Sequence, residues 1–452
     1  MSKWLNKGKV SILNLRPVET LAGAGGTSEA GEFEQLFQLA FKCFRLFALT
    51  PGQLQKQKDR YTVRNTRWMI AIVLVLVLVA WVALVETFFV ESRTALITGI
   101  ANHIQFLMNT IALSAAWIVP QLKTTELGTI LEGFMIIDRE LSAYSVLDAG
   151  ANKRLPFFLR YGAVLTGLAV LTIFDGYVSF AQLGTMEVWY WLSHQVPFLV
   201  YALGFLYAYV LISWLQTRFQ HLNKLVERYY RQGRILATSH HTTIEFATLI
   251  KLDDQVPTVE DLQPIGNPEH SDDVKVLAIV SRTIDLGQKI EAYFGPLFLT
   301  VYTALFSVTT IQLYYCYLHL NSKPGLGLSI ESLVQSGAII LCNVIAIVAL
   351  PYVCEQVESE SKLLMSSLSK LSMKHGQTAP HSSIWFPNLI SSVRFSALGF
   401  FTINYNMLSG LVAGMVTYLI IFIQFNSMVP ATKDDTHQSR RSTLVSEERF
   451  SL

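Results

Sequence analysis

The chain has 452 residues, of which 51% are hydrophobic and only 15% are charged, and its formal net charge is +2. Soluble domains carry about 25% charged residues, so this composition excludes an ordinary soluble protein and indicates a membrane protein. No basic and aromatic stretch is typical of a nucleic-acid surface, so no nucleic-acid partner is expected.

The N-terminal 67 residues are expected to be a retained tail, because they lack the apolar core of a signal peptide. Within them, Phe33–Phe47 has apolar residues at helical spacing. This pattern predicts an amphipathic helix that lies either on the membrane or on the cytoplasmic ends of other helices.

Apolar runs of about 20 residues mark membrane-spanning helices. The second run is the weakest, because polar side chains between Asn102 and Asn109 interrupt it. Together the runs predict an all-α protein of seven transmembrane helices that embeds in a lipid bilayer. The predicted spans are Trp68–Val90, Leu96–Val119, Phe157–Leu183, Val188–Gln216, Tyr293–His319, Gly327–Gln356 and Ala397–Phe425.

The 35 Lys and Arg residues set the orientation, since most of them lie in the N-terminal tail and in the loops 120–156, 217–292 and 357–396. Positively charged loops stay in the cytoplasm. The N-terminus and the long loop 217–292, with helical continuations at both its ends, are therefore predicted to be cytoplasmic. The tail 426–452 is predicted to be extracellular.

This orientation is opposite to that of G-protein-coupled receptors, so the sequence does not support one. Asp138-Arg139-Glu140 is interpreted as ordinary charge on a cytoplasmic helix extension. The sequence has no Gly-rich phosphate loop, HExxH motif, nucleophile elbow or CxxC pattern. We therefore expect no enzyme activity, no cofactor and no metal site.

Polar and aromatic side chains in the predicted outer halves of spans two to six indicate one cavity that opens to the outside. Aromatic walls with a few hydrogen-bonding groups suit a small polar or amphipathic ligand of a receptor or a transporter. For Trp191, His194 and Gln195, hydrogen bonding between helices is an equally open interpretation. The candidate ligand-binding residues are Asp175, Trp191, His194, Gln195, Gln312, Tyr314 and Gln335.

The last span has a small and polar stripe at helical spacing, with Tyr418 and Phe425 at its border. Such a stripe fits either close helix packing or a wall that faces water. One wall cannot enclose a pore, although symmetry-related copies can. The stripe consists of Asn406, Gly410, Ala413, Gly414, Thr417, Ile421 and Gln424.

The stretch SALGFFTINYNMLSGLVAGMVTYLIIFIQF at 396–425 resembles the signature of the insect gustatory receptor family, above all in Thr417-Tyr418, five hydrophobic residues and Gln424-Phe425. The resemblance implies a tetrameric, ligand-gated cation channel, related in architecture to insect odorant receptors. It further implies identical or related subunits, a plasma-membrane location in sensory neurons, and gating that needs no G protein. The implied pore and gate residues are Thr417, Tyr418, Ile421, Gln424 and Phe425, with Gln424 and Phe425 at the outer constriction.

The resemblance also implies that a helix pair at Ser366–Lys374 and Trp385–Arg394, within the region 357–396, forms a cytoplasmic anchor between subunits. Asp175 adds a likeness to the fructose-receptor branch, whereas residues 327–356 lack the tryptophan that this branch carries. The ligand is therefore expected to be a small tastant, with a sugar, a bitter compound and another chemical cue all open.

Overall fold

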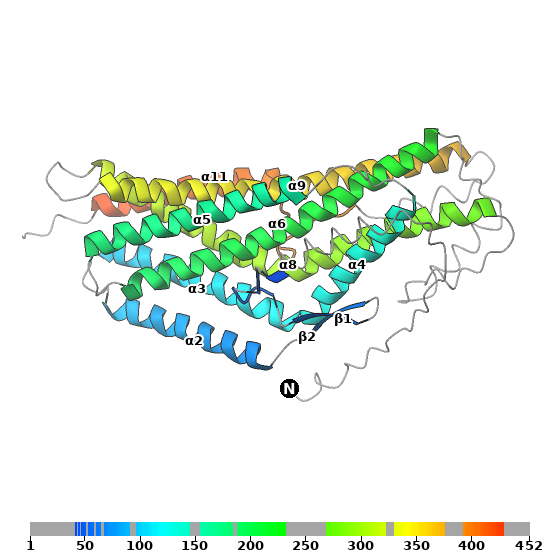
Figure 1. Cartoon of the computed structure of the whole chain (residues 1–452). Coiled ribbons are helices and arrows are strands. Elements are labelled where there is room, and N and C mark those ends of the chain that lie inside the picture. Colours follow the sequence, from blue (N-terminus) through cyan, green and yellow to red (C-terminus); the bar gives the residue numbers. More distant parts are fainter. Residues whose placement is uncertain are drawn as a thin grey trace, which may run out of the picture.

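The architecture is a bundle of long helices with one β-hairpin (Figure 1). The hairpin pairs β1 (Gln53–Gln57) with β2 (Arg60–Arg64) in antiparallel register. The helices are α2 (Arg67–Val90), α3 (Leu96–Leu122), α4 (Thr124–Ala143), α5 (Arg154–Leu183), α6 (Val188–Arg231), α8 (Pro268–Asn321), α9 (Ile330–His375) and α11 (Tyr405–Met428). The computed structural model describes residues 41–42, 44–45, 47–50, 53–57, 60–64, 67–90, 96–144, 154–183, 188–231, 268–321, 330–375 and 392–428.

Each predicted span overlaps a helix, but the helices differ in hydropathy. Within the described residues, six helices are long and apolar enough to cross a membrane, namely α2, α5, α6, α8, α9 and α11. The helix α3 is not one of them, since polar side chains such as Asn102 and Asn109 interrupt its apolar run. Buried Ala112, Leu113 and Ala116 instead pack α3 inside the bundle.

Three helices extend well past their predicted spans. As predicted, helical continuations flank the long loop, because α6 runs on to Arg231 and α8 begins at Pro268. These extensions lie on the same side of the bundle as α4 and the end of α9, at the right of Figure 1. The helix α9 reaches His375 without a break, so Ser366–Lys374 is its last part and not a separate helix.

The other implied anchor helix is only partly described. Residues 385–391 lie outside the described residues, and residues 392–394 are not helical. Val393 is buried there and contacts α8, because a Cβ added to Gly287 of α8 would lie only 2.7 Å from Val393 Cγ1. The expected second helix is therefore wrong for residues 392–394, and a non-helical segment packs against α8 in its place.

The N-terminal segment Phe41–Thr50 packs on the helix bundle. The ring of Phe44 lies 4.7 Å from that of Tyr207 in α6. Trp117 of α3 donates its indole N–H to the Phe47 carbonyl at 3.0 Å. Of the two predicted placements of the amphipathic helix, these contacts match packing on other helices, while residues 33–40 lie outside the described residues.

The helix α11 begins at Tyr405, eight residues later than the predicted start at Ala397. Leu398 and Gly399 form a tight turn, with φ angles of 52° and 78°. Positive φ angles are incompatible with a right-handed α-helix. The Asn404 side chain then accepts the Met407 N–H at 3.1 Å and caps the helix. The apolar run extends through this turn, which is why hydropathy placed the start too early.

Asp138-Arg139-Glu140 was interpreted as ordinary charge on a cytoplasmic helix extension, but two of these three charges form ion pairs between helices. Both carboxylate oxygens of Asp138 accept hydrogen bonds from Arg218 of α6, at 2.9 and 2.6 Å, and both side chains are buried. Glu140 pairs with Arg282 of α8. Burial raises the pKa of Glu140 above its ordinary value, and the nearby Arg282 guanidinium offsets only part of that rise.

Candidate functional site

Three of the predicted ligand residues meet where α5, α6 and α9 adjoin. Asp175 of α5 is only 4% exposed. One oxygen of its carboxylate accepts the indole N–H of Trp191 at 2.8 Å, and the other accepts the side-chain N–H of Gln335. Gly176 makes room for this cluster, since an added Cβ would lie 3.2 Å from Trp191 Cζ2. We call Asp175, Trp191 and Gln335 the carboxylate cluster.

The carboxylate cluster is chemically unusual for a membrane interior. A buried carboxylate is stabilised by a cation or by several hydrogen bonds. Within the described residues, Asp175 has two neutral donors and no Lys or Arg partner. Ionisable groups at this depth usually face protein interiors or ligand pathways. The cluster is therefore the polar centre of the candidate ligand site.

The remaining predicted ligand residues do not join this cluster through any described contact. Gln195 and Gln312 are buried on α6 and α8. Tyr314 of α8 is fully buried, and its ring lies 5.5 Å from that of Phe422 in α11. His194 lies in α6, but its side chain is outside the described part of the structure. Tyr314 therefore contacts the predicted pore helix.

Three further polar side chains, which are not among the predicted ligand residues, are half-buried or buried in the bundle. Asn102 of α3 accepts a hydrogen bond from the Tyr315 hydroxyl of α8. Asn109 and Asn343 are 0% and 1% exposed, and neither side-chain amide has a hydrogen-bond partner among the described residues. Both residues interrupt predicted spans, and that interruption was the signal by which sequence reasoning could have included them.

The helix α11 is the least buried of the candidate spans. Only 6% of its apolar stretch is buried, against 72% for α6. Thr417 and Gln424 are exposed, Ile421 is half-buried and Phe425 is 57% exposed. The Thr417 hydroxyl donates to the Ala413 carbonyl at 2.8 Å. The small and polar stripe therefore lies mostly on the uncovered side of the helix.

Tyr418 lies at the edge of that uncovered side. Its side chain is 52% exposed, and its ring lies 5.8 Å from that of Phe306 in α8, in a T-shaped arrangement. Phe422 and buried Met415 also belong to the covered side of α11. The helix thus has one side that packs on α8 and another that no other described part of the chain covers.

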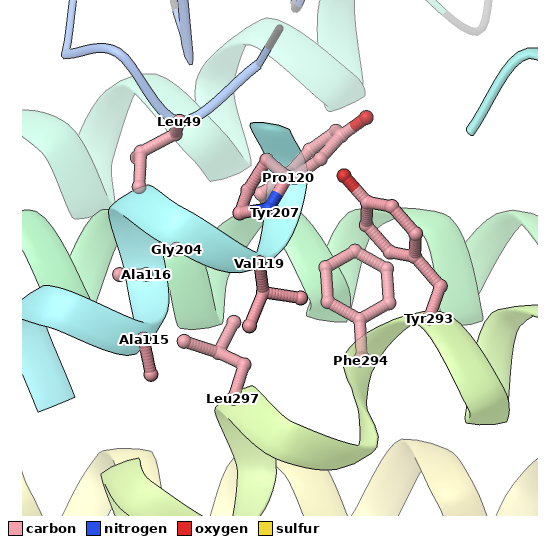
Figure 2. Close-up of a pocket in the computed structure, with 10 residues that line it drawn as sticks. All are labelled: Leu49, Ala115, Ala116, Val119, Pro120, Gly204, Tyr207, Tyr293, Phe294 and Leu297. Atoms are coloured by element: carbon pink, nitrogen blue, oxygen red, sulfur yellow. The ribbon is translucent and has the colours of Figure 1, made fainter. Parts of the chain in front are cut away.

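A hollow lies between the N-terminal segment, α3, α6 and the middle of α8 (Figure 2). The hollow has an empty volume of about 260 Å³ and is partly open to solvent. It is so narrow that little more than a water molecule fits inside. It contains none of the predicted ligand residues. Its walls are Leu49, Ala115, Ala116, Val119, Pro120, Gly204, Tyr207, Tyr293, Phe294 and Leu297.

Solved structures with a similar fold come from an insect receptor. The olfactory receptor OR5 from Machilis hrabei, in complex with eugenol, matches with a TM-score of 0.56 and 10% sequence identity, over 88% of this chain and 99% of that chain. A second structure of OR5 matches with a TM-score of 0.53, 10% identity and the same coverage. At this identity the likeness shows the fold alone.

Sequence comparison identifies the family. No curated protein sequence matches the chain. The family profile described as 7tm chemosensory receptor matches residues 37–429, which is most of the chain. That family consists of multi-pass membrane receptors and not of enzymes, in agreement with the absence of catalytic motifs. The chain therefore belongs to the 7tm chemosensory receptor family.

Proposed function

We propose that this chain is a gustatory receptor that acts as a ligand-gated, non-selective cation channel in the plasma membrane of sensory neurons. The supporting observation is the uncovered side of α11, which carries the exposed side-chain amides of Asn406 and Gln424. Lipid cannot satisfy polar side chains at membrane depth. A central, water-filled pore between four copies would satisfy them.

In the proposed tetramer, α11 of each identical or related subunit lines the pore. Thr417 and Ile421 would lie along the conduction path, with Tyr418 at its border. Gln424 and Phe425 would form the outer constriction, since both are exposed near the last turn of α11. The chain would cross the membrane seven times, with α3 as an internal span, a cytoplasmic N-terminus and an extracellular C-terminus.

The proposed ligand is a small tastant, either a sugar or a bitter compound, that binds at the carboxylate cluster. Hydroxyl or amine groups of such a ligand would replace the neutral donors that Trp191 and Gln335 now offer to Asp175. The helix α9, which carries Gln335, packs against both α8 and α11. A displacement of α9 can therefore reach the pore helix through direct packing.

Binding opens a channel only if the ligand prefers the open form. A tenfold preference per site shifts the equilibrium by about 1.4 kcal/mol per bound ligand. Occupancy of several subunits adds these contributions. A ligand that binds both forms equally would bind without producing current.

The test is to express this chain alone and record whole-cell currents during application of D-fructose, caffeine and a wider tastant panel. We expect at least one compound to evoke a current that reverses near 0 mV and persists when a G-protein inhibitor fills the pipette. A transporter that uses the same cavity is the alternative. Saturable uptake of a tastant, with no evoked current across the panel, would contradict the channel proposal.

A further inference from the structure

The two glycines of the Gly410-x-x-x-Gly414 pair in α11 have different surroundings. Gly410 is exposed, and a Cβ added there would meet no atom within 4 Å. A Cβ added to Gly414 would lie 3.0 Å from Cε2 and 3.4 Å from Cζ of Phe306 in α8. The Phe306 ring therefore lies where a side chain at position 414 would be, while position 410 has free space.

Phe306 contacts a second residue of α11 one turn further along. Its ring forms a T-shaped pair with Tyr418, at a centroid distance of 5.8 Å and an interplanar angle of 84°. Aromatic pairs in this arrangement are directional, because the edge of one ring faces the other ring. Phe306 thus packs against α11 at residues i and i+4, the spacing that places two side chains on the same face.

The Phe306 contact limits how α11 can rotate about its axis. Tyr302–Phe401 and Tyr314–Phe422 are further ring contacts between α8 and the α11 region, at 6.0 and 5.5 Å. Among these three contacts, only that of Phe306 fits against a glycine. Rotation of α11 in either direction would separate the Phe306 and Tyr418 rings or press backbone against Phe306.

We propose that Phe306 is a positioning residue for gating, which packs onto Gly414 and against Tyr418 and so couples movement of α8 to the orientation of the pore helix. This proposal rests on the proposed channel function. It predicts that position 414 must lack a side chain because Phe306 lies against it on the covered side of α11, whereas exposed Gly167 of α5 tolerates a methyl group.

The experiment compares Gly414→Ala with Gly167→Ala of α5 as its control, because Gly167 is exposed and a Cβ added there would meet no atom within 4 Å. In each variant we would measure surface expression, the unliganded current and the agonist concentration for half-maximal current. D-fructose and caffeine are the first probes, together with any compound that activates the wild type. At equal surface expression, Gly414→Ala should change the half-maximal concentration or the unliganded current at least about fivefold. Gly167→Ala should stay within about twofold.

A rescue variant separates coupling from general damage. Phe306→Leu removes the ring edge that a methyl at position 414 would strike. The half-maximal concentration and the unliganded current of the double variant Phe306→Leu with Gly414→Ala should therefore be closer to those of the wild type than the product of the two single effects predicts. If Gly414→Ala fails to reach the surface, Tyr418→Leu replaces it in the cycle with Phe306→Leu.

Each outcome has a defined meaning. A wild type without any current overturns the channel function and, with it, this inference. A conducting wild type whose Gly414→Ala and Gly167→Ala variants behave alike overturns only the coupling role of Phe306. Independent, multiplicative effects in the cycle would also overturn that role.

Discussion

The buried ion pair between Asp138 and Arg218 should be a main stabilising contact between α4 and α6. The pair is bidentate, at 2.9 and 2.6 Å, and its two side chains are only 10% and 8% exposed. Arg218 also donates to the Trp214 carbonyl at 3.0 Å, and its guanidinium lies 5.3 Å from the centre of the Phe134 ring. These contacts fix the guanidinium in a single orientation.

The perturbation is Arg218→Met, which keeps most of the side-chain volume and leaves Asp138 buried without its cation. Removing one partner of a buried ion pair destabilises a protein by about 3–5 kcal/mol. Replacing both partners with apolar residues of similar size is often neutral or stabilising. The double variant Asp138→Leu with Arg218→Met should therefore recover most of the stability that Arg218→Met loses.

The assay is thermal unfolding of the purified protein in detergent. At each temperature it measures the fraction of protein that remains soluble and of native size. Arg218→Met should lower the unfolding midpoint, and the double variant should raise it again towards the wild type. The control is a variant in which Asp285 and Lys289, a solvent-exposed ion pair on α8, are exchanged for each other. This exchange should change the unfolding midpoint little. Equal midpoints for Arg218→Met and the wild type would refute the reasoning, as would a double variant that is less stable than the single one.

Three further predictions concern the ligand site, the packing before α11 and the gate. Asp175→Asn should raise the half-maximal agonist concentration at least about tenfold, since a hydrogen bond to a charged group contributes about 1.5–3 kcal/mol; an unchanged dose–response curve would remove Asp175 from the site. Gly287→Ala should lower stability by about 1–3 kcal/mol because its methyl would overlap Val393, and thermal unfolding should show partial recovery when Val393→Ala is added. Phe425→Ala should raise the basal current in whole-cell recordings, and basal and evoked currents that both match wild type would place the constriction elsewhere.

Apolar length predicted the positions of the helices well, because backbone groups in a membrane must be satisfied within each helix. Hydropathy could not predict where helices stop. It placed the start of α11 at Ala397, since the turn at Leu398 and Gly399 depends on backbone angles and not on polarity. It also could not show that α9 continues as one helix to His375.

The sequence also could not predict which side chains that are distant along the chain contact each other. Depth along the helices suggested that Asp175, Trp191 and Gln335 share one region, but not that their side chains contact each other. Likewise, the composition of a helix extension cannot reveal that Asp138 pairs with Arg218, which is 80 residues away. The stripe on α11 was visible from periodicity, whereas the different surroundings of Gly410 and Gly414 depend on where Phe306 lies.

The most direct test of the channel account is the accessibility of Gln424 from water. Gln424→Cys should let a positively charged methanethiosulfonate, applied outside the cell, block the agonist-evoked current, because this exposed position would lie in the outer pore. Met415→Cys is the matched control on the same helix, since Met415 is only 8% exposed and lies on the covered side. We predict rapid block for Gln424→Cys and none for Met415→Cys or the wild type. Unblocked current through surface-expressed Gln424→Cys channels would contradict a pore lined by α11.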